Sequence, residues 1–529
     1  MPYCCPFHFK LSRLIAFFFN IISEIFSGVM EVDLSSETEE CSTDVGITTQ
    51  NALLNYTRAG MRVESGGQDA FSWEKHQDLF NPDVKEMIDI VLDEIQFDKK
   101  LTCFQELFLH SIASKRDVFG IANTGAGKTE VTGLASHLLR KVYQKPTGLI
   151  VMFVPLTGIL HELLDSDHTV TAVITMNGQM FGREGERRVA VKEEDILSGK
   201  FSRLVMHPET LKNSNVENMM LKLKLNEQVI GVIIDEFHII LPGHWSSFRP
   251  GMEEQTARLR VFLRKGAPTG ALSATATKDE LSGTIETLGL RCEPVIIAES
   301  PIQNHFKYIL LRRPSDNYGF EGFTDVNKMY HAGLLDQLKT IYIDEFVRCI
   351  LNNQEPKHGI IFFRTENQLI FLLNYLREIL GQCIASSAPF VCLLSSTPPV
   401  TELVISKRKG SIYLYLTPQK MLLGLNIPKL DICIFVKPMN MLHSIIQGGG
   451  RTGRPVPGEP GIRTRSLVYI LANGGDVGAQ VKGMSEEVRQ FVNHKSGCLK
   501  AYMGKYFMGN FNPSLRDSEW CCSFCSSSP

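Results

Sequence analysis

The chain has 529 residues, of which 43% are hydrophobic and 21% are charged, and its formal net charge is −2. A chain of this size and composition is globular, and about two to four domains are expected. The near-neutral charge excludes an overall electrostatic footprint for nucleic acid, so a polyanion must bind to a local patch. Thirteen scattered cysteines argue against a disulfide framework and favour a reducing compartment.

The first 80 residues are expected to form a partly disordered extension. Residues 30–72 are rich in acidic residues, Ser and Thr, which is typical of a solvated linker. Residues 14–26 are apolar and follow basic residues, so a signal peptide or a membrane anchor is one interpretation. This stretch is shorter than the ~20 residues that a spanning helix needs, contains Asn20 and Glu24, and lacks a small-residue cleavage site. A docking helix or a misassigned gene start is therefore favoured over a membrane role.

Alternating helix and strand patterns begin near Pro82. Residues 83–92 place apolar side chains about 3.6 residues apart, as in an amphipathic helix. Such alternation implies parallel sheets that are covered by helices on both faces. In a first block, strands are predicted at 117–122, 148–154, 201–206, 229–234 and 270–272. In a second block, strands are predicted at 359–363, 390–394, 411–416, 432–436 and 466–470.

A glycine-rich segment after the first predicted strand has the pattern of a phosphate-binding loop. Its residues are Thr124, Gly125, Ala126, Gly127, Lys128 and Thr129. The two glycines let backbone N–H groups turn inward around phosphate oxygens, where a Cβ would obstruct them. Lys128 supplies a charge to the β- and γ-phosphates, and the Thr129 hydroxyl can bind Mg²⁺. A helix that begins near Thr129 also directs its positive end at the phosphates.

Two carboxylates follow the predicted strand 229–234, an apolar and β-branched run that is typical of a buried parallel strand. Asp235 and Glu236 lie at its carboxyl end, where ligands of open α/β sheets bind. Asp235 is expected to hold Mg²⁺ and Glu236 to polarise the attacking water. Either motif alone occurs by chance, but both in this order indicate an ATP site. Because only the first block has the loop, an ATPase cleft between two similar units is predicted.

The order of the remaining motifs resembles that of superfamily 2 helicases of the DEAD/DEAH type, and most of all the RecQ family. The resemblance covers roughly residues 81 to 525. Gln105 matches the glutamine that reads the adenine edge. Segments 153–156 and 207–210 match the helicase segments that contact one nucleic-acid strand. Segment 272–277 matches the motif that couples the bound nucleotide to the binding of that strand. The resemblance assigns strand contacts to Pro155, His207 and Thr275.

The RecQ assignment depends on residues 242–250, which resemble the aromatic-rich loop of that family. Trp245 and Phe248 can stack on unpaired bases, at about 1–3 kcal/mol per base, without reading sequence. Arg249 can contact a phosphate or lie on an aromatic face. The alternative is an ordinary packed loop with Trp245 in the core.

Residues 447–454 match the QxxGRxGR motif of these helicases. By this resemblance, Gln447, Arg451 and Arg454 face the nucleotide across the cleft. A guanidinium from the second domain stabilises the charge that develops on the γ-phosphate, which makes hydrolysis depend on domain closure. Arg454 is the first choice for this role and Arg451 the second. The alternative is a basic, glycine-rich turn.

The C-terminal cysteines resemble part of the four-cysteine zinc module of RecQ proteins. Cys498, Cys522 and Cys525 are the candidate Zn²⁺ ligands, and Cys521 is a strained fourth. His494 and Glu519 are alternatives for the fourth position. A tetrahedral site needs four ligands, so the competing interpretation is a tail of free thiols.

These observations predict an α/β fold with two tandem RecA-like domains and a small C-terminal cysteine-containing helical module. The expected boundaries are 1–80 for the extension, 81–297 for the ATP-binding domain, 298–475 for the second domain and 476–529 for the module.

The resemblance implies an ATP- and Mg²⁺-dependent DNA helicase or translocase that moves 3′ to 5′ on single-stranded or forked DNA, in repair or recombination. Nuclear localisation follows from that substrate alone. Since no winged-helix domain fits before Pro529, translocation is expected rather than strong unwinding. An RNA helicase and a non-catalytic nucleic-acid-binding relic are the alternatives, and a membrane partner is not expected.

Overall fold

The computed structural model describes most of the chain beyond residue 76. The described residues are 77, 79–123, 125–155, 157–164, 170–184, 187–241, 258–259, 267–290, 294–312, 334–364, 366–380, 390–392, 412–419, 427, 429–453, 464–478, 481–508 and 520–526. The predicted acidic linker and the apolar stretch at 14–26 lie outside them. Within the described part, no helix is both long and apolar enough to cross a membrane. All described residues belong to one compact unit, Thr49–Pro529.

A nine-stranded sheet forms the centre of the first lobe, which we define as residues 82–298. Its strand order is β5-β4-β3-β6-β2-β7-β8-β1-β9, and the strands are parallel except where β4 pairs with β3 and β5. The strands are β1 (Val118–Ile121), β2 (Leu149–Phe153), β3 (Thr171–Ile174), β4 (Met180–Glu184), β5 (Arg187–Ala190), β6 (Arg203–Met206), β7 (Val229–Asp235), β8 (Thr269–Ser273) and β9 (Val295–Ala298).

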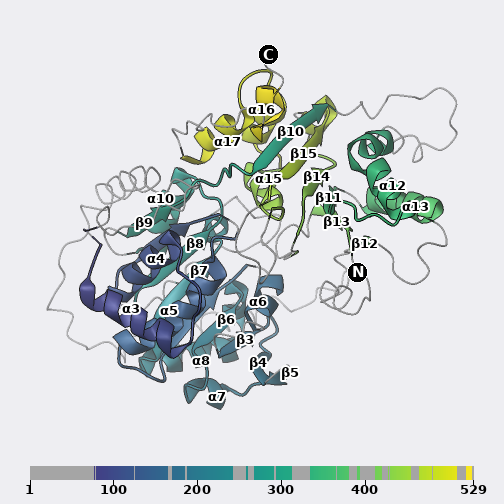
Figure 1. Cartoon of the computed structure of the whole chain (residues 1–529). Helices are drawn as coiled ribbons and strands as arrows, with labels where there is room; N and C mark the ends of the chain where they lie inside the picture. The colour runs from purple at the N-terminus through teal and green to yellow at the C-terminus, as the bar shows by residue number, and fades with distance from the viewer. Residues whose placement is uncertain are drawn as a thin grey trace, which may run out of the picture. The chain divides into compact units, whose positions relative to one another are not determined.

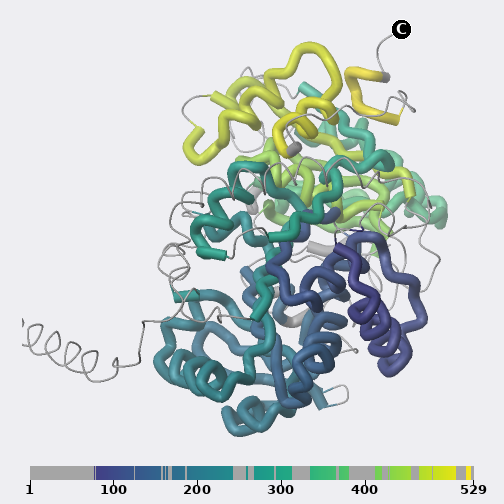
Figure 2. Tube along the Cα trace, turned by 90° about the vertical axis from the view of Figure 1, so that its left-hand side faces the viewer, coloured from purple at the N-terminus to yellow at the C-terminus, as the bar shows by residue number. Residues whose placement is uncertain are grey.

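Helices cover both faces of this sheet. They are α3 (Pro82–Glu94), α4 (Cys103–Ala113), α5 (Lys128–Val142), α6 (Thr157–Leu164), α7 (Glu193–Leu197), α8 (Ser214–Leu225) and α10 (Lys278–Leu288), with the 3₁₀ turns η2 (Pro208–Lys212) and η3 (Phe237–Ile240). Successive residues of β2 alternate between two buried clusters, because side chains along a strand point to opposite faces. One cluster contains α3, α4 and α5, which group together in both views (Figure 1, Figure 2). The other contains α8 and α10.

A six-stranded parallel sheet forms the centre of the second lobe, residues 306–526, in the order β10-β15-β14-β11-β13-β12. Its strands are β10 (Phe306–Arg312), β11 (Gly359–Phe363), β12 (Phe390–Cys392), β13 (Leu414–Pro418), β14 (Ile432–Phe435) and β15 (Ser466–Ala472). Its helices are the π-helical turn η4 (Lys339–Ile343), α12 (Asp344–Leu351), α13 (Glu366–Leu380), α15 (Leu442–Gly449), the 3₁₀ turn η7 (Gly474–Val477), α16 (Glu486–Val492), α17 (Leu499–Met508) and α18 (Ser523–Ser526).

The two faces of the second sheet are covered by different parts of the chain. Helices α12 and α13 pack on one face. Helices α15, α16 and α17 pack on the other, together with the C-terminal cysteines (Figure 1). The cysteine-containing segment is therefore part of the core of the second lobe.

The predicted fold class is confirmed, and each of the ten predicted strands overlaps an observed one. The hairpin β4–β5, the strand β3 beside it, and β9 and β10 at the sheet edges were not predicted. Strand β5 has no buried residue and carries arginines, so it lacks the apolar run by which the other strands were found.

His110 joins α3 to α4 in a way that makes the fold sensitive to acid. Its side chain is buried, and its Nε2 accepts a hydrogen bond of 2.7 Å from the Asn81 N–H, so this nitrogen is unprotonated. The ring also stacks on Phe80, with centroids 5.7 Å apart. Burial, and then the nearby charge of Lys85, lower the pKa of His110 from about 6.5 to about 4.

We therefore expect the free energy of unfolding to fall as the pH drops from about 6.5 to about 4. In this window the unfolded chain binds the proton that the folded chain excludes, so stability rises with pH and is lost on acidification. Urea unfolding across the window measures the slope. His110→Gln keeps an acceptor but cannot titrate, and its slope should be smaller than that of the wild type by up to about one proton. Equal slopes would show that His110 titrates normally.

Candidate nucleotide site and cysteine cluster

The phosphate-binding loop has the backbone that its glycines predict. Gly125 and Gly127 have φ values of 85° and 83°, which L side chains rarely adopt. A Cβ on Gly127 would lie 2.2 Å from Nε2 of Gln105. Helix α5 begins at Lys128, one residue before the predicted start. Thr124 lies outside the described residues, and the side chain of Ala126 is buried.

Lys128 is held at the carboxyl end of β1. Its Nζ donates hydrogen bonds to the carbonyl oxygens of Ala122 at 2.6 Å and Asn123 at 3.0 Å. The ammonium group therefore lies on the side of the loop where the first sheet ends. Thr129 follows in the first turn of α5 and is exposed.

The side chain of Gln105 is hydrogen-bonded to Thr102, Gly127 and Glu130. Its Oε1 accepts from the Thr102 N–H at 2.9 Å, which completes a capping box at the start of α4. Its Nε2 donates to the Gly127 carbonyl at 3.4 Å and to Glu130 at 3.1 Å. Reading an adenine edge with this side chain therefore requires an exchange of hydrogen bonds, and this role stays a prediction.

The two carboxylates that are predicted to act in hydrolysis lie two strands away from the loop. Strand β8 pairs with β1 on one side and with β7 on the other, so the ends of these three parallel strands are neighbours. Asp235 is the last residue of β7 and is partly exposed. Glu236 follows in the left-handed region, with φ 51° and ψ 50°. A non-glycine residue in this region is uncommon and is enriched at functional sites.

Three polar side chains surround the Glu236 carboxylate. Its Oε2 lies 3.4 Å from Ser273 Oγ, 3.5 Å from His238 Nδ1 and 3.4 Å from Gln447 Nε2. Ser273 ends β8, and His238 lies in η3 and contacts the same Ser273 hydroxyl at 2.9 Å. Gln447 comes from the second lobe. The carboxylate thus receives hydrogen bonds from both lobes.

The residues of the second lobe that were predicted to face the nucleotide belong to α15 or come after it in the sequence. Gln447 is in this helix, and its Nε2 also reaches Thr275 Oγ1 at 3.4 Å. Arg451 comes two residues after the helix ends and is partly buried. Arg454 lies outside the described residues, so its predicted role has no structural account.

Three of the residues that the resemblance assigns to contact with a nucleic-acid strand lie in the described part of the first lobe. Pro155, His207 and Thr275 are all buried. His207 Nδ1 lies 2.8 Å from the Val154 carbonyl, so its ring ties two loops of the first lobe together. Thr275 instead meets Gln447 at the contact between the lobes. Contact of these three residues with a nucleic-acid strand stays a prediction, and their burial limits the part that the side chains can take in it. Trp245, Phe248 and Arg249 lie outside the described residues.

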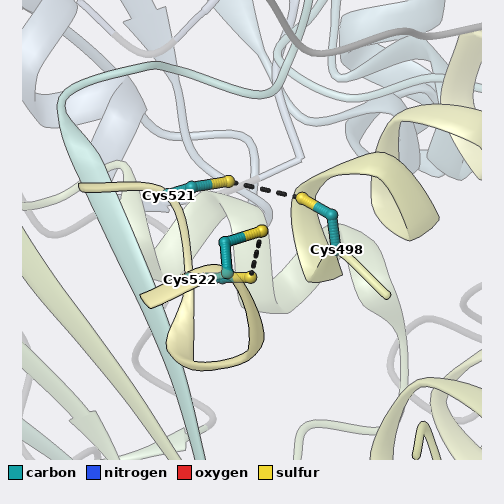
Figure 3. Close-up of side chains that lie close together, drawn as sticks. Cys498, Cys521 and Cys522 are labelled. Atoms are coloured by element: carbon teal, nitrogen blue, oxygen red, sulfur yellow. Dashed lines mark hydrogen bonds between the residues drawn. The ribbon is translucent and has the colours of Figure 1, made fainter. Parts of the chain in front are cut away.

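The four C-terminal cysteines converge. The sulfur atoms of Cys498, Cys521, Cys522 and Cys525 all lie within 4.8 Å of one another. Cys498 Sγ is 3.3 Å from Cys521 Sγ (Figure 3), and Cys522 Sγ is 3.6 Å from Cys525 Sγ. Tetrahedral thiolates about 2.3 Å from a Zn²⁺ ion lie about 3.8 Å apart, so the set fits one ion. The fourth member of the cluster is Cys521, which was predicted to be a strained fourth ligand. His494 is not part of the cluster, and Glu519 is outside the described residues.

The lowered pKa of one thiol and the attachment of the cluster to a strand both suit a metal ion. Hydrogen bonds with Cys498 and Cys521, together with one from the Leu499 amide, hold the pKa of the Cys522 thiol well below its usual range. A thiolate is the form that binds a metal. The cluster is mounted on β10, where the Tyr308 amide donates to the Cys521 carbonyl at 3.4 Å.

Sequence analysis missed the polar residues that link the lobes. Glu280 of α10 and His443 of α15 are both buried, and their side chains are 2.9 Å apart. One signal was present, since His443 precedes Gln447 by four residues and the two share one face of a helix. The acidic partner is 163 residues away, a separation that no local pattern reveals.

Comparison with known proteins identifies the type of domain around this site. Residues 102–282 match the DEAD/DEAH box helicase family, so the predicted DEAD/DEAH-type core is confirmed for these residues. No curated protein sequence matches the chain. Among solved structures, the DUF1998 helicase MrfA bound to DNA is 16% identical, with a TM-score of 0.52 over 78% of this chain and 53% of that one. The chain thus spans about half the length of MrfA.

Two further structures are similar at lower TM-scores. Mycobacterium smegmatis helicase Lhr bound to ssDNA and AMP-PNP is 16% identical, with a TM-score of 0.49 over 74% of this chain and 48% of that one. S. cerevisiae Dbp5 bound to RNA and ADP BeF3 is 16% identical, with a TM-score of 0.47 over 76% of this chain and 90% of that one. Identity at this level shows the fold alone, and the RecQ resemblance stays a prediction.

We expect Gly127→Ala to weaken ATP binding by about ten-fold or more, because a left-handed conformation costs about 1–2 kcal/mol in an L residue. The new Cβ also meets Gln105, so the loop must move. Titration with a fluorescent ATP analogue and Mg²⁺ measures the loss. Gly474→Ala is the matched control, since no atom lies within 4 Å of that Cβ and its φ is not positive. Unchanged affinity in Gly127→Ala would separate this loop from nucleotide binding.

Proposed function

We propose that the chain is an ATP-dependent DNA helicase or translocase of the RecQ type, which moves 3′ to 5′ on single-stranded or forked DNA. The observation that carries the proposal is the contact of Gln447 with Glu236 at 3.4 Å. It connects the second lobe to the residue that polarises water in the first. Such a contact makes hydrolysis depend on the approach of two lobes, which is what a motor requires.

The residues at the end of the first sheet fit ATP and Mg²⁺. Gly125, Gly127 and the start of α5 form an anion-binding backbone, and Lys128 adds a charge beside it. Thr129 and Asp235 are the residues that would hold Mg²⁺, which neutralises phosphate charge when it is bound. Glu236 then orients and polarises water, while Ser273 and His238 fix its carboxylate.

The second lobe supplies the groups that complete the site. The Oε1 atom of Gln447 is buried and, among the described residues, has no hydrogen-bond partner. It is therefore available to orient a water while Nε2 holds Glu236. Arg454, or Arg451 in its place, is proposed to stabilise the charge on the γ-phosphate.

The choice of DNA rather than RNA rests on the resemblance of residues 242–250 to the aromatic loop of RecQ proteins. The RecQ resemblance is also supported by the four converging cysteines, for which we propose Zn²⁺ as the ion. A function in DNA repair or recombination, and localisation in the nucleus, are proposed from the DNA substrate alone.

Steady-state ATP hydrolysis with no polymer, single-stranded DNA, duplex DNA or RNA of equal length tests the proposal. Single-stranded DNA should stimulate the rate most, and Glu236→Gln should lower kcat by about 100-fold or more, as expected for loss of a general base. Glu378→Gln, an exposed residue of α13, is the control and should change nothing. Stimulation by RNA alone would identify an RNA helicase, and no stimulation by any polymer would identify the non-catalytic relic.

Metal analysis of the purified full-length chain tests the cysteine cluster. One Zn²⁺ per chain is expected, and Cys521→Ser should lower the metal content and the midpoint of thermal unfolding, because metal binding is coupled to folding. Cys103→Ser is the control, since that cysteine lies in α4 and is not part of the cluster. Full zinc content in Cys521→Ser, with loss in a His494 variant, would mean that His494 is the fourth ligand.

A further inference from the structure

We propose that His443 is a positioning residue whose pairing with Glu280 holds α15 against the first lobe, so that Gln447 reaches Glu236. This inference rests on the proposed ATPase function for its catalytic consequence. The contact itself joins the lobes whether or not ATP is hydrolysed. Neither residue binds the nucleotide or the metal in the proposed mechanism.

The pair is shorter than the hydrogen bonds that Gln447 of α15 makes with the first lobe. His443 Nε2 lies 2.9 Å from Glu280 Oε2, and both side chains are buried. The hydrogen bonds from Gln447 to Glu236 and Thr275 are each 3.4 Å long. Hydrogen bonds weaken as they lengthen, and those to a charged group are the stronger class. The His443–Glu280 pair is therefore the firmer attachment.

The environment of Glu280 keeps it ionised. Burial on its own raises the pKa of this carboxyl. His443, His238 and the Thr277 amide together outweigh the burial and bring the pKa to about 2. The Thr277 N–H donates to the same Oε2 at 2.7 Å, as part of the capping box at the start of α10. A buried carboxylate needs such partners, and one of them comes from the other lobe.

The His443 ring has aromatic contacts in both lobes. It stacks on His238, with centroids 5.3 Å apart and an interplanar angle of 16°. Phe507 and Tyr506 of α17 meet it in T-shaped contacts, with centroids 4.9 and 5.9 Å away. His443 is thus held between α17 of its own lobe and the histidine that follows Asp235 and Glu236 in the first lobe.

The position of His443 affects that of Gln447, because both residues lie on one face of α15. Residues four apart lie on the same face of a helix, one turn from each other. His443 is in the first turn of α15, and Gln447 is in the second. When the first turn is tied to Glu280, the second turn lies over Glu236 and Thr275. Loss of the pair frees α15 to withdraw, which removes a hydrogen bond from the water-polarising carboxylate.

Glu280→Gln is the most informative variant, because Gln also completes a capping box and leaves no buried charge unpaired. His443→Phe keeps an aromatic ring between His238 and Phe507 but removes the donor. The double variant closes a thermodynamic cycle with the two single ones. Glu286→Gln, exposed on the same helix, is the matched control.

Two readouts are compared for each full-length protein. In hydrolysis, Glu280→Gln should lower kcat by about ten-fold while the KM for ATP changes less than about three-fold, since a hydrogen bond to a charged group becomes a weaker neutral one and no nucleotide contact changes. The double variant should be no slower than the slower single one. Equal kcat in wild type and Glu280→Gln, or additive losses in the cycle, would overturn the proposal.

The second readout measures lobe approach without hydrolysis. Fluorophores on non-natural residues at the exposed positions Leu225 and Leu351 report the distance between the lobes with AMP-PNP and single-stranded DNA. The closed population should be smaller in Glu280→Gln than in the wild type and in Glu286→Gln. Identical distance distributions overturn the proposal. A wild type that closes but does not hydrolyse ATP would refute the proposed function and leave this result standing.

Discussion

The parallel pairing of β7, β8 and β1 is the constraint on which the site depends. Ile121 lies opposite Ser273, and Asp235 lies opposite Leu272, so three strands end at nearly the same level. Because parallel strands share one direction, their carboxyl ends meet at one edge of the sheet. That edge carries the phosphate-binding loop, Ser273 and the two carboxylates. Segments more than a hundred residues apart in sequence thereby become neighbours.

The left-handed conformation of Glu236 ends β7 and turns the chain into η3. An extended β7 would carry Glu236 straight on from Asp235. The turn at φ 51° ends the strand and starts η3, so that His238 returns toward Ser273 and toward the second lobe. Backbone strain of this kind costs about 1–3 kcal/mol and persists only where its surroundings hold it. Here Ser273, His238 and Gln447 converge on the same carboxylate oxygen.

Local patterns in the sequence predicted the strands and the nucleotide loop because each needs only neighbouring residues. Apolar runs marked the buried strands, and the spacing of Gly125, Gly127 and Lys128 marked the loop. The edge hairpin β4–β5 was missed because an exposed arginine-rich strand has no apolar pattern. His207 and Thr275 were assigned to a strand surface by resemblance, but burial is a tertiary property. The pairing of His443 with Glu280 was invisible for the same reason, since packing alone brings the two residues together.

The C-terminal segment packs against the contact between the lobes. Helix α17 begins directly after Cys498, and near its other end Tyr506 and Phe507 pack on the ring of His443. A helix of ten residues therefore connects the cysteine cluster to His443. If the cysteines bind an ion as proposed, it would fix one end of α17 to β10 and limit how far the other end can move from His443. The cluster would then act on the proposed hydrolytic site in the other lobe without touching nucleotide or nucleic acid, because the packing between them is continuous.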